Sequence, residues 1–293
     1  VGLYASLGYS LLGLAIVFLL NSVIMIVLGI VSWFMLPTET LLKSGNDQKA
    51  ANREVLAGMS VTLRLPEVWL AGIAGFGVYL AYTSMPFFLT YLQDLHALPV
   101  LAISIFGIVS TSGGRIGIAL PSGFIADRYL GGASGGLRVG LFGVAVLAGL
   151  AVAVALSGGS AWLAMGLMIL LSVLFFFMRA LYFAPFGEMG LPPRFSGSVI
   201  AVAAFMIYLP SSFAYLLWGF ILDSYPGTLG YGLMFGILGA MALLSAAVAH
   251  RLHRRIVSGA AQRISARIIA LDTELGLNGE EKTLSELVDA KGR

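Results

Sequence analysis

The chain has 293 residues, of which 59% are hydrophobic and 11% are charged, with a formal net charge of +3. Soluble domains carry about 25% charged residues, so this composition excludes an ordinary soluble globule and predicts an all-α polytopic membrane protein. The absence of cysteine excludes a disulfide framework, a thiolate metal site and a cysteine nucleophile.

Seven apolar stretches are each near or above the ~20 residues that a helix needs to cross a bilayer. Because the stretches are continuous rather than alternating, helices are favoured over a barrel. The predicted spans cover approximately 12–36, 68–92, 100–125, 137–157, 162–186, 197–222 and 229–249. The chain begins at Val1 inside apolar sequence, so we expect residues 1–11 to end an earlier helix and its outer turn, with an upstream part missing.

The basic residues assign the sides of these spans. All seventeen Lys and Arg except Arg115 and Arg179 fall on one face, in loops, in the tail or, for Arg138, at the inner end of a span, and the opposite face receives none. Basic residues are retained on the cytoplasmic side during insertion. We therefore predict a multi-pass inner-membrane protein, with no nucleic-acid partner. Its predicted parts are a first segment (1–36), a cytoplasmic central loop (37–67), a six-helix bundle (68–250) and a cytoplasmic tail (251–293).

Two residue types support this arrangement. Trp33 and Trp69 are predicted near inner span ends, and Trp162 and Trp218 near outer ends, where indole favours the headgroup layer. Small residues allow close approach of helices in lipid, which predicts packing roles for the closely spaced glycines Gly113, Gly114, Gly117, Gly140 and Gly143.

The third span ends in Gly123-Phe124-Ile125-Ala126-Asp127-Arg128, followed by Tyr129-Leu130-Gly131-Gly132. This segment resembles the cytoplasmic signature of the major facilitator superfamily: a glycine, three residues, an aspartate, a basic residue and then glycine. In that family the signature recurs between the eighth and ninth of twelve spans. The usual basic cluster after it is reduced here to a delayed Arg138, and the N-terminal copy of the motif is not present for comparison.

Further segments resemble the same family. The loop ending in LPEVW before the second span resembles its central loop, and LPPRFSGSVIAV (191–202) resembles the entry to its eleventh span. The resemblance covers nearly everything from residue 12 to 250 and implies spans six to twelve of twelve. The run RALYFAPFGE (179–188) also resembles a bacterial subgroup of sugar- or organic-acid-type facilitators.

Arg115 is the main candidate for solute contact. It lies twelve residues before Asp127, about 18 Å along a helix, and therefore near the bilayer midplane. A guanidinium there costs ~2.5 kcal/mol or more and is too deep to reach the headgroups easily. No predicted span contains Asp or Glu, so a carboxylate partner would have to come from the upstream part. The alternative is a structural arginine that donates to neighbouring carbonyls.

Aromatic and hydroxyl side chains are predicted to complete the lining of the solute site. Tyr79 and Tyr82 lie about 18–22 Å above Glu67 and thus near the depth of Arg115. Pro86 and Pro210 are expected to break or bend their helices. The predicted lining comprises Tyr79, Tyr82, Thr111, Ser112, Arg115, Tyr208, Ser211, Ser212 and Tyr215. Interhelical packing is the alternative role for the Tyr and Ser stripe on the sixth span.

A second group is predicted to form a gate or latch at the inner side, and comprises Gly123, Asp127, Arg128, Arg179, Glu188 and Arg194. Gly123 would permit close helix packing, and the Asp127–Arg128 pair sits at the membrane surface. Arg179 lies nine residues before Glu188, about 14 Å along a helix. We expect it either to extend toward the inner interface or to pair with Glu188 or the Asp127 region.

The resemblance implies a secondary active transporter that works by alternating access, coupled to a proton or a sodium ion. With Arg115 as counter-charge, we expect a small polar, anionic solute such as an organic acid or sugar acid. The other expected partners are the lipid bilayer and the missing N-terminal half of the same protein. One alternative is a facilitator for a neutral sugar or drug-like solute, with Arg115 structural. A non-transport alternative is a seven-helix membrane sensor.

We expect neither an enzyme nor a cofactor. His96, His250 and His253 lie at span ends or in the tail, whereas a membrane protease or metalloenzyme needs such groups clustered within the bilayer. A retinal protein needs a lysine inside a span for its Schiff base, and all four lysines, Lys43, Lys49, Lys282 and Lys291, lie outside the predicted spans.

Overall fold

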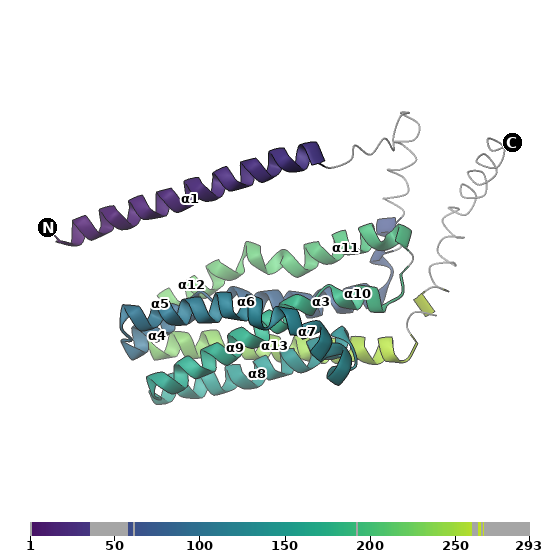
Figure 1. Cartoon of the computed structure of the whole chain (residues 1–293). Coiled ribbons are helices and arrows are strands. Elements are labelled where there is room, and N and C mark those ends of the chain that lie inside the picture. Colours follow the sequence, from purple (N-terminus) through teal and green to yellow (C-terminus); the bar gives the residue numbers. More distant parts are fainter. Residues whose placement is uncertain are drawn as a thin grey trace. The chain divides into compact units, whose positions relative to one another are not determined.

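The computed structural model describes residues 2–35, 58–60, 62–191, 193–259, 263–264 and 266, and every element in these ranges is a helix (Figure 1). The chain divides into two compact units, Val1–Asn52 and Arg53–Arg293, which we describe separately. Most of the predicted central loop (37–67) and of the tail (251–293) lies outside the described residues.

The first unit contains helix α1 (Gly2–Met35), whose segment Phe18–Met35 is long and apolar enough to cross a membrane. A helix satisfies every backbone N–H and C=O internally, as lipid requires, so an uninterrupted apolar run favours it. The predicted first span is thereby confirmed. The helix continues without a break from Gly2, so the outer turn expected within residues 1–11 is wrong.

The second unit contains the other six predicted spans. Four are continuous segments of sufficient length and hydropathy: Ala133–Ser157, Ala161–Glu188, Ser196–Ser224 and Thr228–Val257. Two more are bent helix pairs, Pro66–Thr83 with Phe87–His96 at 42°, and Leu101–Gly117 with Ala119–Leu130 at 47°. When each bent pair is counted as one span, the described helices give seven spans, as the sequence predicts.

The elements of the second unit follow in chain order. They are α3 (Pro66–Thr83), α4 (Phe87–His96), α5 (Val100–Ile108), the π-helical turn η1 (Val109–Gly113), α6 (Gly114–Gly117), α7 (Ala119–Ile125), the π-helical turn η2 (Ala126–Leu130), α8 (Ala133–Ser157), α9 (Ala161–Leu181), α10 (Ala184–Glu188), α11 (Pro193–Tyr208), the 3₁₀ turn η3 (Leu209–Ser212), α12 (Ala214–Ser224) and α13 (Thr228–Val257).

Helix α13 packs along both α8 and α3, while α9 packs on α8 and α11 on α3. Small residues permit these close approaches. A Cβ added at Gly140 would lie 2.5 Å from Met178 Cγ, and one at Gly143 would lie 2.9 Å from Leu174 Cδ1, which confirms the packing predicted for both glycines. A Cβ at Gly114 would overlap the Phe176 ring.

Gly113 and Gly117 do not share the packing role of Gly114. A Cβ at either position would meet no described atom within 4 Å, so the packing predicted for these two is wrong within the second unit. The three glycines present the same signal in the sequence, but only one side of the helix faces Phe176. The helix containing Gly114 can therefore lie directly against α9 beside Arg115.

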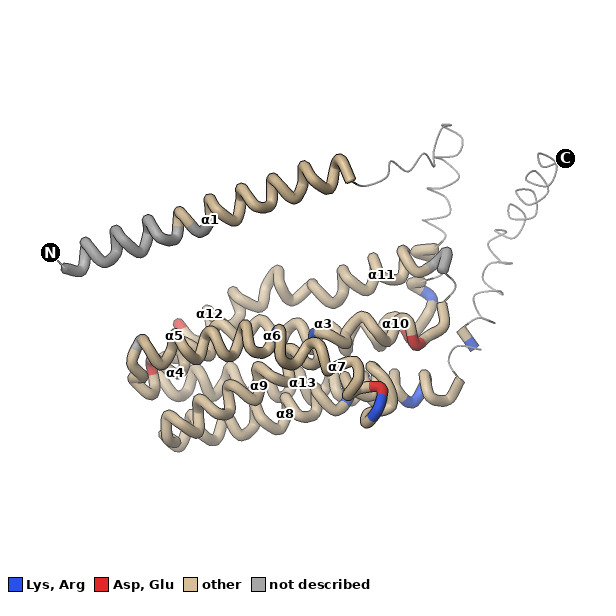
Figure 2. The backbone as a smooth tube through the Cα atoms, in the orientation of Figure 1, with Lys and Arg blue, Asp and Glu red and all other residues tan. Residues whose placement is uncertain are grey.

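The two ends of the second unit differ in charge. Lys and Arg gather toward one end, whereas Asp and Glu occur at both (Figure 2). At the basic end, Arg255 Nη1 forms a salt bridge with Glu67 Oε1 at 3.0 Å, joining α13 to α3. At the other end, Tyr231 Oη donates to Asp94 Oδ2 at 2.7 Å. Because basic residues are retained on the cytoplasmic side, we expect the basic end to face the cytoplasm.

The tryptophans only partly follow the predicted boundaries. Trp33 and Trp162 are exposed, as headgroup-layer residues would be. Trp69 is exposed as well and donates from Nε1 to Leu63 O at 2.9 Å. Trp218 is fully buried and donates from Nε1 to Thr83 Oγ1 at 3.2 Å, so its predicted interfacial role is wrong. A buried hydroxyl satisfies the indole N–H that headgroups were expected to satisfy.

Candidate functional site

Three spans are interrupted within their apolar length. Helix α3 ends at Thr83 and α4 resumes at Phe87, because Pro86 lacks the backbone N–H that a continuous helix needs. The π-helical turn η1 interrupts the α-helix of the next span just before Arg115, and the 3₁₀ turn η3 interrupts the α-helix that contains Pro210. The breaks predicted at Pro86 and Pro210 are confirmed.

Hydroxyl side chains donate hydrogen bonds to the backbone carbonyls that lose their helical partners at these breaks. Thr83 Oγ1 donates to Leu80 O at 2.6 Å, and Ser84 Oγ donates to Ala81 O at 2.7 Å. At the η3 break, Ser211 and Ser212 donate in the same way to the carbonyls of Tyr208 and Leu209. Such back-bonding makes an interrupted helix tolerable at membrane depth.

Four tyrosines, from α3, α11 and the C-terminal cap of α9, meet beside these breaks. We call Tyr79, Tyr82, Tyr182 and Tyr208 the tyrosine cluster. The rings of Tyr79 and Tyr208 meet edge to face with centroids 4.9 Å apart, and those of Tyr79 and Tyr82 lie 5.9 Å apart. The hydroxyls of Tyr182 and Tyr208 share a hydrogen bond of 2.9 Å. The cluster therefore offers both aromatic faces and hydroxyl oxygens.

Both arginines of the spans converge on Tyr82. The Cζ atom of Arg179 lies 4.0 Å from the centroid of the Tyr82 ring and 5.8 Å from that of Tyr79. The Nη2 atom of Arg115 lies 3.5 Å from Tyr82 Oη, at the outer limit of a hydrogen bond, and its Cζ lies 5.9 Å from the Phe176 ring. Two permanent positive charges thus share one aromatic side chain.

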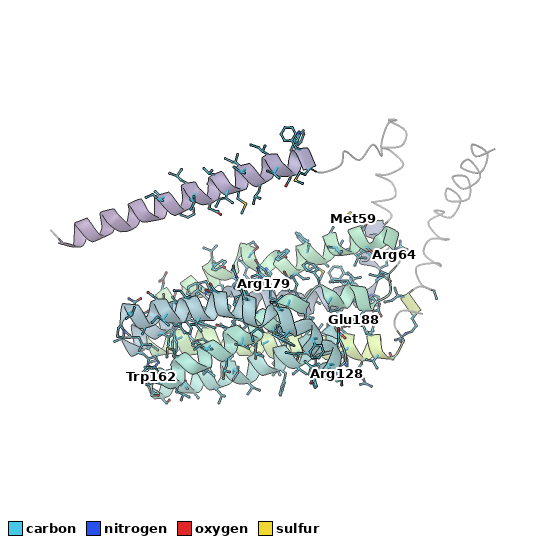
Figure 3. All side chains as sticks on the ribbon, viewed as in Figure 1. Met59, Arg64, Arg128, Trp162, Arg179 and Glu188 are labelled. Atoms are coloured by element: carbon cyan, nitrogen blue, oxygen red, sulfur yellow. The ribbon has the colours of Figure 1, made fainter. Side chains whose placement is uncertain are left out.

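Arg179 does not make the contacts predicted for it, while its gate role stays a prediction. Its guanidinium lies over the rings of Tyr82 and Tyr79 instead of extending to the inner interface or pairing with Glu188. Figure 3 shows Arg179 and Glu188 at separate places along the second unit. Arg179 Nη1 is buried and has no hydrogen-bond partner among the described residues. Aromatic faces attract a guanidinium but accept no in-plane N–H bond, so one donor is left free for a ligand.

Beside Tyr82 lies a hollow of about 250 Å³, lined by Tyr82, Met85, Pro86, Leu89, Thr111 and Tyr215. Three predicted lining residues, Tyr82, Thr111 and Tyr215, thus come together from three different spans. Tyr208 and Tyr215 are 38% and 46% exposed, so the site opens on a face that the described second unit leaves uncovered. The hollow is therefore a recess with polar side chains at its edge, and it lies at the same membrane depth as Arg115.

Other predicted lining residues lie outside this hollow. Ser112 is exposed within η1. Ser211 and Ser212 are exposed at the η3 break, where they donate hydrogen bonds to backbone carbonyls. Sequence reasoning missed Tyr182 and Phe176. The spacing of Arg179 and Tyr182, one helical turn apart, is the signal that links Tyr182 to the site.

Glu188 has a different partner from the predicted one. Its carboxylate accepts hydrogen bonds from the backbone N–H groups of Ala133 and Ser134 at the start of α8. A carboxylate there satisfies unpaired donors and complements the helix dipole. Gly132, with φ of +97°, leaves the room for this contact, because a Cβ would lie 2.5 Å from Glu188 Oε1.

The remaining latch residues show few contacts. Asp127 and Arg128 lie exposed in η2, and no salt bridge joins either to another described residue. A Cβ at Gly123 would meet no described atom within 4 Å, so the packing role predicted for it is wrong within the second unit. The side chain of Arg194 lies outside the described residues. The latch function of Asp127 and Arg128 stays a prediction.

Two curated proteins of Escherichia coli (strain K12) are similar to the chain in sequence. Inner membrane protein YihN is 30% identical over 256 residues, which make up 85% of this chain and 59% of YihN. Inner membrane protein YqcE is 27% identical over 229 residues, 78% of this chain and 53% of YqcE. The chain therefore spans a little over half the length of these relatives.

No protein-family model matches the chain, and no solved structure matches it. The two relatives and the described spans agree on the cellular location and on the class of protein. The chain is a distant homologue of these two inner membrane proteins and is itself a helical, multi-pass protein of the inner membrane.

Proposed function

We propose that the protein is a secondary transporter of the major facilitator type, and that it moves a small anionic solute, such as an organic acid or sugar acid, by alternating access. The observation that carries the proposal is the convergence of Arg115 and Arg179 on Tyr82 within the spans. The predicted spans contain no Asp or Glu to neutralise this charge. An anion at this position would supply the missing counter-charge.

The local geometry supports solute binding at this depth. Transporter sites form near the bilayer midplane where helices are discontinuous, and three interrupted spans meet around the hollow beside Tyr82. In the proposal, Arg115 and the free Nη1 of Arg179 bind carboxylate oxygens, and Thr111 and Tyr215 contact the rest of the solute. Arg179 thereby moves from the predicted gate to the proposed solute site.

A neutral sugar is the second candidate solute. It is favoured by the number of aromatic faces, because Tyr79, Tyr82 and Tyr208 resemble a platform on which a sugar ring can stack. In this alternative the two arginines brace the tyrosines and contact no solute. The predicted spans contain no carboxylate for ion coupling, so we expect a coupling proton or sodium ion to be held elsewhere in the protein.

A panel of matched acids and neutral parents separates these candidates. Uptake is measured in membrane vesicles from cells that express the gene, with glucuronate against glucose, galacturonate against galactose, and lactate against glycerol. The proposal predicts that the carboxylate member of a pair is transported at least about tenfold faster, equivalent to ~1.4 kcal/mol of charge recognition. Faster uptake of the neutral members would contradict the anion proposal and favour the sugar alternative.

A further inference from the structure

A second and larger hollow lies between α8 and α13, away from the solute site. It encloses about 460 Å³ and is lined by Arg138, Val139, Phe142, Leu243, Ala246, Ala247 and His250. Neither helix contributes a residue to the tyrosine cluster or to the hollow beside Tyr82. We call this second recess the α8–α13 groove.

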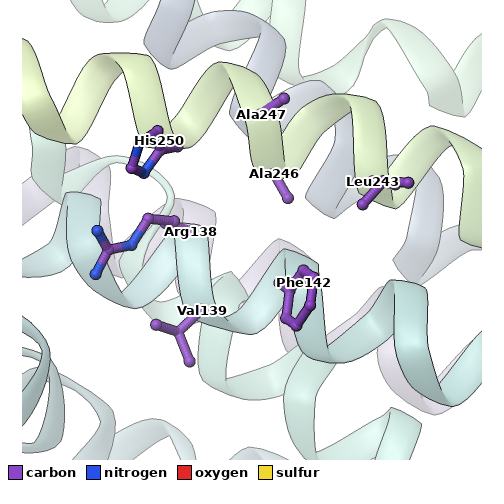
Figure 4. A pocket seen from close by; sticks show the side chains of 7 residues that line it. All are labelled: Arg138, Val139, Phe142, Leu243, Ala246, Ala247 and His250. Atoms are coloured by element: carbon purple, nitrogen blue, oxygen red, sulfur yellow. The ribbon is translucent and has the colours of Figure 1, made fainter.

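The groove has one polar end and one apolar end. Arg138 on α8 and His250 on α13 lie at the same end, and Phe142 and Leu243 lie at the other (Figure 4). The four lining residues of α13 recur at three- and four-residue steps, so they form one face of that helix. Along that face, His250 and Leu243 are separated by about 10 Å.

The polar end lies at the level of the cytoplasmic headgroups. Arg138 is five residues inside the start of α8, and His250 is seven residues inside the end of α13, at the basic end of the second unit. These offsets correspond to about 8 and 10 Å along the helices, close to the boundary between headgroups and hydrocarbon. No hydrogen bond or salt bridge joins the Arg138 guanidinium to another described residue.

The large apolar side chains that line the groove are exposed. Val139, Phe142 and Leu243 are each about half exposed, although they are large hydrophobic side chains. Between these large side chains, Ala246 and Ala247 form the floor of the groove, and their small side chains leave it open. An acyl chain laid along this floor would pack against apolar side chains that the described second unit leaves open.

We propose that the α8–α13 groove is a binding site for one anionic phospholipid of the cytoplasmic leaflet. The headgroup phosphate would bind Arg138 and His250, and an acyl chain would lie against Phe142, Leu243 and Ala247. Charge complementarity favours this occupant over a zwitterionic lipid, because Arg251 and Arg254 add positive charge at the same end of α13. The nearby Glu188 carboxylate is engaged by the start of α8 and does not neutralise Arg138.

Native mass spectrometry tests this site on the full 293-residue chain. The chain is purified in micelles that contain phosphatidylglycerol and phosphatidylcholine in equal amounts with identical acyl chains. One retained phosphatidylglycerol per chain is expected, with retention favoured over phosphatidylcholine. Arg138→Gln is expected to lower this preference about fivefold, since a basic residue near an anionic surface contributes about that factor. Arg64→Gln, which changes an exposed cation that does not line the groove, should alter the preference less than about twofold.

Ala247→Phe keeps both polar groups and fills the floor of the groove, so it is expected to abolish retention of either lipid. Circular dichroism and gel filtration establish that each variant is folded. Equal retention of both lipids by the wild type, or an unchanged preference in Arg138→Gln, would overturn the proposal. Displacement of the lipid by soluble glycerol 3-phosphate would also overturn it, because the site would then recognise a phosphate alone. A change from dimer to monomer in Ala247→Phe would assign the groove to a second copy of the chain.

Discussion

Arg115→Ala is expected to reduce uptake of an anionic solute by about 30-fold or more while the protein still inserts and folds. Loss of one member of a desolvated charge pair typically costs 2 kcal/mol or more, which corresponds to that factor. The side chain is exposed and its contact with Tyr82 is long, so the fold does not depend on it. Initial uptake rates at low solute concentration, corrected for the amount of protein in the membrane, measure the effect.

Two variants control this experiment. Arg115→Lys keeps the positive charge but loses the planar guanidinium, which can bind a carboxylate through two hydrogen bonds. It should therefore recover part of the uptake. Arg251→Ala removes a cation at the cytoplasmic end of α13 and should leave uptake within about twofold of wild type. Unchanged transport by Arg115→Ala would remove Arg115 from the solute site and with it the main reason to expect an anion.

Arg179→Met is expected to lower uptake at least tenfold without lowering thermal stability. Its Nη1 is buried without a described partner, and an unsatisfied buried donor costs about 1–3 kcal/mol. The lost attraction to the Tyr82 ring is worth about 0.5–2 kcal/mol, so the two effects nearly cancel in the free energy of unfolding. A residue whose removal leaves stability unchanged but lowers uptake is one retained for binding.

Thermal unfolding in detergent and vesicle uptake, measured on the same preparations, test this prediction. Leu181→Ala serves as the structural comparison, because Leu181 is a buried side chain two residues along the same helix. It should lose about 2–5 kcal/mol of stability. If Arg179→Met unfolds as easily as Leu181→Ala, then Arg179 is part of the core and its loss of transport says nothing of solute binding.

The spans and their breaks were predictable because their causes are local in the sequence. Apolar length specifies a span, and a proline without an N–H specifies a break, as Pro86 and Pro210 do. Depth is equally local, since counting residues along two helices places Arg115 level with Tyr82. The 3.5 Å approach of Arg115 Nη2 to Tyr82 Oη agrees with that arithmetic.

Rotation about a helix axis was not predictable in the same way. Arg179 was placed at the correct depth, but hydropathy does not distinguish the side of α9 that faces Tyr82 from the side that leads toward Glu188. The partner of Glu188 is a pair of backbone N–H groups, which no pattern of side-chain charges reveals. The interfacial role predicted for Trp218 was wrong for a related reason, because its hydrogen-bond partner Thr83 lies 135 residues away in sequence.

Water access to the hollow beside Tyr82 tests the central claim most directly, and the chain contains no cysteine, so one introduced thiol is the sole target. Thr111 lines the hollow, whereas Val146 is an exposed apolar residue midway along α8. Only a thiolate in water reacts with a membrane-impermeant thiosulfonate. We predict that Thr111→Cys reacts, that a transported acid slows the reaction, and that Val146→Cys does not react. An inert Thr111→Cys, or equal reaction at both positions, would contradict a wet, anion-binding passage at this site.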